Sequence, residues 1–284
     1  MEKLIVWTNF CFDPLHALWE SKKGQEIIAS LLVFIFTLSL VLIELKRFNL
    51  LPSSSFSLLL PSNPFFAVHL AFSLLLIFEV ISFIFVLPCS VSKAVGKQLE
   101  ILSLIFLRNC FKLLTEFNEP INFASHLSII WQIGTYALGS LLIYLILFFY
   151  YLILKDAHKK EQIRGKNIFY FVGSKKIISL LLLVIFISMG VYNIYSYFNH
   201  KQLITFFNEF YTLLIFSDIL IVLIAHRYFP TFKDTFRNSG YAIATLLMRL
   251  CLTAPIYYDV IIGLMASCFA LALTFIYMKT KKET

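Results

Sequence analysis

The chain has 284 residues, of which 60% are hydrophobic and only 14% are charged, and its mean hydropathy is +0.83. An ordinary soluble domain is about 45–50% apolar and about 25% charged, and a soluble core of this length cannot hide so much apolar surface. The composition therefore excludes a soluble globular protein, a disordered chain, collagen-like repeats and a disulfide scaffold. It predicts an all-α fold, a polytopic bundle of seven to eight transmembrane helices that forms one membrane domain over residues 1–284.

Residues 1–25 are predicted to lie along the membrane surface as an interfacial segment. Asp13, Pro14 and Glu20 interrupt its apolar residues, which argues against a signal peptide. Aromatic and aliphatic side chains recur over residues 7–19, a composition typical of a helix at the membrane interface.

Seven apolar stretches are predicted to cross the membrane, because a spanning helix needs roughly 20 mainly apolar residues. They are residues 26–45, 65–88, 128–154, 176–198, 204–227, 240–254 and 258–279. The last two come from one long apolar stretch that is broken at Pro255, since proline lacks a backbone donor and disfavours helix in the residue before it. Asn238 and Ser239 are expected to cap the span that begins at residue 240.

Residues 92–117 decide between seven and eight spans. Their charged residues fall near one drifting stripe at 3.6 residues per turn, and the rest of the helix circumference is Leu, Ile and Phe. An amphipathic helix in the membrane plane fits this pattern, and so does a spanning helix whose charged stripe faces the bundle interior. The distribution of basic residues favours the second, because eight crossings place most Lys and Arg, and both termini, on the cytoplasmic side.

We interpret the net charge of +8 as membrane topology rather than nucleic-acid binding. Basic residues gather in the 155–175 linker, in the 227–238 loop and in the C-terminal tail, which share one side of the membrane if each later span crosses once. Cytoplasmic loops collect Lys and Arg, so we expect these segments in the cytoplasm and the protein in the cytoplasmic membrane. Besides the lipid bilayer, the expected partners are further copies of the chain in a homo-oligomer and a cytoplasmic protein that binds the basic loops.

Four charged residues inside predicted helices are candidate pathway residues: Glu79, Arg108, Asp218 and Arg249. A charge at the bilayer centre costs about 2.5–3.5 kcal/mol on insertion scales, so such a residue needs a partner or water. Counting about 1.5 Å per residue from the cytoplasmic helix ends, Asp218, Arg249 and Glu79 share one level. We expect an Asp218–Arg249 ion pair with Glu79 nearby, and Arg108 closer to the outer leaflet. Secondary pathway candidates are Lys97, Glu100 and Lys112.

These charges permit two interpretations: they hold helices together, or they line a path for an ion, a proton or a small solute. The sequence holds no P-loop, nucleophile elbow or intramembrane-protease motif, and its five cysteines have no metal-ligand spacing, so neither cofactor nor metal is expected. An enzyme is the less favoured class, with Asp259, Glu119 and His126 as candidates. The leading prediction is an ion channel or small-solute transporter, and the alternative is a non-catalytic membrane subunit that anchors or signals to a cytoplasmic partner.

Overall fold

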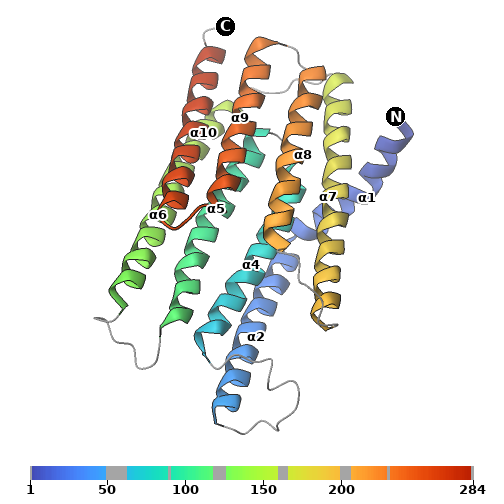
Figure 1. Cartoon of the computed structure of the whole chain (residues 1–284). Coiled ribbons are helices and arrows are strands. Elements are labelled where there is room, and N and C mark those ends of the chain that lie inside the picture. The colour runs from blue at the N-terminus through green and yellow to red at the C-terminus, as the bar shows by residue number, and fades with distance from the viewer. Residues whose placement is uncertain are drawn as a thin grey trace.

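The chain folds into a bundle of long α-helices in the computed structural model, which confirms the predicted all-helical class (Figure 1). The structure describes residues 2–48, 63–88, 91–117, 126–158, 166–198, 206–228 and 231–282, and these ranges contain no strand. The helices are α1 (Glu2–Glu20), α2 (Lys22–Arg47), α4 (Phe65–Val86), α5 (Val91–Leu113), α6 (Leu127–His158), α7 (Lys166–Phe198), α8 (Phe206–Tyr228), α9 (Phe232–Cys251) and α10 (Tyr258–Lys282), and the 3-10 turn η1 (Leu114–Glu116) follows α5.

Six helices in the described ranges are long and apolar enough to cross a membrane, so the protein is an integral membrane protein. These six are α2, α4, α6, α7, α8 and α10. α5 and α9 are not among them, because each carries charged residues along its length. The finer count of seven or eight crossings stays a prediction.

α5 is the central helix of the bundle and runs alongside its neighbours rather than across their ends (Figure 1). It packs against α4 and α6, and also touches α9 and α10. Twelve of its 23 residues are buried. A helix lying on the membrane surface would expose one face to water, so this packing agrees with the second interpretation of 92–117, in which the charged stripe faces other helices. The ends of α6, α8 and α10 and the start of α9 lie together at one end of the bundle, here called the proximal end (Figure 1).

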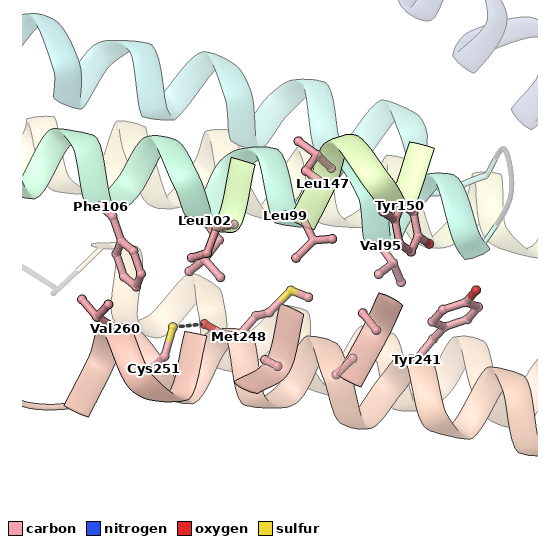
Figure 2. Close-up of a cluster of buried hydrophobic side chains, with 14 of the residues drawn as sticks. Val95, Leu99, Leu102, Phe106, Leu147, Tyr150, Tyr241, Met248, Cys251 and Val260 are labelled. Atoms are coloured by element: carbon pink, nitrogen blue, oxygen red, sulfur yellow. Dashed lines mark hydrogen bonds between the residues drawn. The ribbon is translucent and has the colours of Figure 1, made fainter. Parts of the chain in front are cut away.

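An apolar core joins α5 and α6 to α9 and α10. Leu102 and Phe106 of α5 face Met248 of α9 and Val260 of α10 (Figure 2). α6 comes close to α10 at Gly139, where a Cβ atom would lie only 2.5 Å from Cγ1 of Val260. Only glycine permits this approach without moving Val260, so part of the helix spacing is set by one missing methyl group.

The start of α9 differs from the prediction. The helix begins at Phe232 rather than at residue 240, and the Thr231 side chain accepts a hydrogen bond from the backbone N–H of Asp234. A threonine in this position satisfies one of the open N–H groups of the first turn, so the cap lies two turns earlier than expected. Asn238 is buried inside the helix and does not cap it.

The predicted 155–175 linker is also shorter than expected, because α6 runs to His158 and α7 begins at Lys166, while residues 159–165 lie outside the described ranges. Lys175 is buried, not solvated. Its Nζ donates to the carbonyl oxygen of Leu87 at 3.1 Å and lies 4.9 Å from the centroid of the Phe171 ring. A lysine that binds a carbonyl at the end of a helix satisfies an acceptor that the helix leaves open, and here it fastens α7 to the end of α4.

α1 is a continuous helix that passes through Pro14 and packs against α7. The Oδ1 of Asp13 lies 2.6 Å from the Nζ of Lys176. Apolar side chains such as Trp7 and Phe10 remain exposed on α1. An exposed apolar surface is what an interfacial helix needs, and the membrane position of residues 1–25 stays a prediction.

Candidate functional site

A buried ion pair joins α8 and α9, as predicted. The Nη2 of Arg249 lies 2.6 Å from Oδ2 of Asp218, and the two side chains are only 6% and 12% exposed. α8 ends ten residues after Asp218, whereas α9 begins seventeen residues before Arg249, so the pair forms between neighbouring helices although its members are not equally far from the connection. A buried charge that loses its partner is strongly destabilising, so the two residues depend on one another.

Glu79 belongs to a different network. Its Oε2 lies 2.6 Å from Nζ of Lys97, which also lies 2.9 Å from Oε2 of Glu100. The hydroxyl of Tyr151 donates to Oε1 of Glu100 at 2.6 Å. This half-buried chain of charges connects α4, α5 and α6, so Glu79 pairs with Lys97 rather than joining the Asp218–Arg249 pair as predicted.

Three hollows follow one another along the seam between α5, α8 and α9. The proximal cavity, of about 30 Å³, is lined by Asp218 and Gln98 among others. The middle cavity, of about 40 Å³, is lined by Gln98, Arg249 and Tyr211. The distal cavity, of about 290 Å³, is lined by Tyr211 and Arg108. Because Gln98 lines the first two cavities and Tyr211 lines the last two, the hollows form a series with narrow points between them.

The middle cavity contains polar atoms with open hydrogen-bonding capacity. Among the described residues, neither Oε1 of Gln98 nor Nε of Arg249 has a hydrogen-bond partner, although both atoms are buried. An amide oxygen accepts and a guanidinium N–H donates, so one water could bond to both. A cavity needs only about 10–15 Å³ to hold a water, and about 40 Å³ is enough. The middle cavity of the seam can therefore be hydrated.

The distal cavity lies at the end of α5 that is away from the proximal end, and it has the most polar lining of the three hollows. Arg108 and Lys112 stand one turn apart on α5, and Asp259 faces the same cavity from the first turn of α10. The hydroxyl of Tyr136 donates to Oδ2 of Asp259 at 2.6 Å, and the backbone N–H of Val260 donates to Oδ1 at 2.7 Å. Two neutral donors thus hold the Asp259 carboxylate in position.

The structure divides the predicted pathway residues into two groups. Asp218, Arg249, Arg108 and Lys112 line the seam. The other three candidates, Glu79, Lys97 and Glu100, form the separate network of α4, α5 and α6.

Sequence reasoning missed Gln98, Tyr136 and Tyr211 as lining residues, and it considered Asp259 only as an enzyme candidate. The chain has 14 tyrosines, so a tyrosine in a helix carries no signal of its own. Gln98 is uncharged and does not stand out beside Lys97 and Glu100. The one signal that could have identified Gln98 as a lining residue is its place beside the charged stripe of residues 92–117.

Comparison with known proteins finds no family model, no curated protein and no solved structure that matches the chain.

Proposed function

We propose that the protein passes a small ion or polar solute across the membrane along the seam of α5, α8 and α9. The observation that carries the proposal is the series of three cavities that share lining residues from one end of the seam to the other. Charged and polar residues inside a membrane protein are costly unless they pair or line a hydrated path. Here the buried pair and the orphaned polar atoms lie on the same line as the cavities.

In this proposal α5 and α9 also cross the membrane, which makes eight crossings with both termini in the cytoplasm. Their charged residues are tolerable there because α5 is buried among other helices and α9 lies against α8 and α10. The proximal end carries Lys155, Arg227 and Lys279 at the ends of α6, α8 and α10, and in this proposal it faces the cytoplasm. The distal cavity then opens toward the outside.

The conformation described here is the closed one under this proposal. Hollows of about 30 and 40 Å³ hold a few waters but not a hydrated ion or a solute. The Asp218–Arg249 pair lies between them, with Asp218 on the proximal cavity and Arg249 on the middle one. Passage requires the pair to separate or to exchange its partners with the permeating species, and the pair is the gate of the seam.

The test is flux through purified full-length protein in liposomes, measured with a panel of monovalent ions and small polar solutes. We expect flux from the natural sequence and its loss in D218L/R249M, which replaces both charged side chains of the pair with apolar ones. The matched control is D13L/K176M, which removes an ion pair of the same 2.6 Å length outside the seam and should keep the flux.

Flux that survives in a correctly folded D218L/R249M protein would show that the pair only holds helices together. A natural protein that passes nothing, and that copurifies with a stoichiometric partner, would instead support the alternative of a non-catalytic membrane subunit. That partner should then bind the basic segments of the proximal end.

A further inference from the structure

We infer that the distal cavity binds a small zwitterionic solute, with the solute carboxylate toward Arg108 and Lys112 and its cationic nitrogen toward Asp259. The inference rests on the proposed function and deepens it, because it names the class of solute that enters the seam. Binding can nevertheless be measured without transport, so the two proposals can fail separately.

The size of the distal cavity fits a ligand with few heavy atoms. Its volume of about 290 Å³ is just below the roughly 300–1,000 Å³ that is usual for sites of drug-sized molecules, so it suits a smaller ligand. It is also several times larger than either of the other two hollows in the seam. A solute can therefore rest in the distal cavity while the rest of the seam is closed.

The charges of the cavity are balanced and lie on different elements. Arg108 and Lys112 come from α5, Asp259 comes from α10, and Glu116 of η1 makes the formal sum of the four zero. A solute with one charge would be attracted by one side of this lining and repelled by the other. A solute with separated charges of both signs is attracted at both ends, and this complementarity selects its orientation as well as its class.

The Asp259 carboxylate is held in position to bind the cationic nitrogen of the solute. The Asp259 carboxylate is 4% exposed and is held by the Tyr136 hydroxyl and the Val260 N–H. An ionised carboxylate has about four lone-pair sites, so about two remain after these bonds. A buried carboxylate gains most from a positively charged partner, and neither of the two donors is charged. An ammonium or a quaternary nitrogen supplies that charge.

Apolar side chains complete the lining and suit the carbon atoms between the two charges. Ile105 and Leu252 contribute where the distal and middle cavities meet, and Ile256 contributes from the connection between α9 and α10. The ligand expected here is a short aliphatic zwitterion rather than an aromatic or a multiply charged solute.

The test is isothermal titration of the detergent-purified full-length protein with L-alanine, γ-aminobutyrate and glycine betaine, which differ in the distance between their charges. Propionate and ethylamine serve as analogues with one charge each. We expect at least one zwitterion to bind about tenfold or more tightly than both analogues, a difference that corresponds to about 1.4 kcal/mol. Equal binding of a single-charge analogue, or no binding of any zwitterion, would overturn the inference.

Charge-removing variants should separate the two ends of the ligand. D259N should weaken zwitterion binding by about tenfold or more and leave or improve propionate binding, while R108Q should weaken the zwitterion and spare ethylamine. E44Q removes a carboxylate from α2, outside the cavity, and should bind like the natural protein. If D259N does not fold, Y136F keeps the carboxylate charge but removes one of its donors, and it should give a smaller loss in the same direction. An unchanged affinity in folded D259N or in Y136F argues against the assigned site.

The outcomes distinguish the two proposals. Zwitterion binding without any flux in liposomes would keep the site and refute transport. Flux of an ion through the natural protein, with no zwitterion bound, would keep the proposed function and refute the solute class.

Discussion

Burial should decide the strength of two ion pairs that have the same length. Asp218 and Arg249 are joined at 2.6 Å with side chains 12% and 6% exposed, whereas Asp13 and Lys176 are joined at 2.6 Å with Asp13 59% exposed. Removing one partner of a buried pair costs about 3–5 kcal/mol, because the remaining charge stays buried without compensation. An exposed pair contributes only about 0.2–1 kcal/mol.

The perturbation is therefore a double-mutant cycle on each pair. D218L alone should lower the free energy of unfolding by about 3–5 kcal/mol, while D218L/R249M should return close to the natural value, because well-packed apolar side chains replace a buried pair at little cost. D13L and D13L/K176M should each stay within about 1 kcal/mol. The coupling energy of the buried pair should therefore exceed that of the exposed pair by about 2 kcal/mol or more.

The assay is reversible unfolding of the purified protein in mixed micelles, titrated with a denaturing detergent and followed by circular dichroism. Additivity within about 0.5 kcal/mol at both pairs would refute the reasoning, since it would mean that the Asp218–Arg249 side chains are hydrated in the folded protein. In that case flux, rather than stability, would be the only property that depends on the pair.

Three further predictions concern helix packing, helix capping and access to the seam. G139A should lower the free energy of unfolding by about 1–3 kcal/mol, because its Cβ would lie 2.5 Å from Cγ1 of Val260, and the double variant G139A/V260A should recover most of that loss. G134A should be neutral or stabilising, because a Cβ there has no neighbour within 4 Å. Thermal unfolding of the three proteins checks this. T231A should cost about 0.5–2 kcal/mol by removing the cap of α9, measured in the same unfolding assay, and an unchanged stability would refute the assigned cap. N109C, on a background without native cysteines, should react with a membrane-impermeant thiol reagent added outside, because Asn109 lines the distal cavity, and protection from that reagent would place the cavity on the other side or inside the bundle.

Several features of the protein could be predicted from the sequence because they depend only on the order and spacing of residues along the chain. Apolar runs of about 20 residues predict membrane helices, and among the described residues six of the seven predicted runs lie in helices long and apolar enough to cross a membrane, the run at 240–254 in α9 being the exception. Pro255 predicts the break between Cys251 and Tyr258, where α9 ends and α10 begins. The Asp218–Arg249 pair was predicted correctly because two buried opposite charges on consecutive helices need partners, although the count that put them at one level started α9 eight residues too late.

The orientation of each side chain around its helix could not be obtained by counting. Glu79 was placed at the level of Arg249, but level says nothing of direction, and the packing of α4 on α5 turns Glu79 toward Lys97. The distal cavity likewise depends on tertiary packing, because residues of the connection between α9 and α10 line it together with residues of α5 and α6. Composition and spacing by themselves determined a membrane bundle with costly buried charges. The rotation and contact of the helices, which are set by side-chain packing across the whole fold, decided which of those charges meet and which line a cavity.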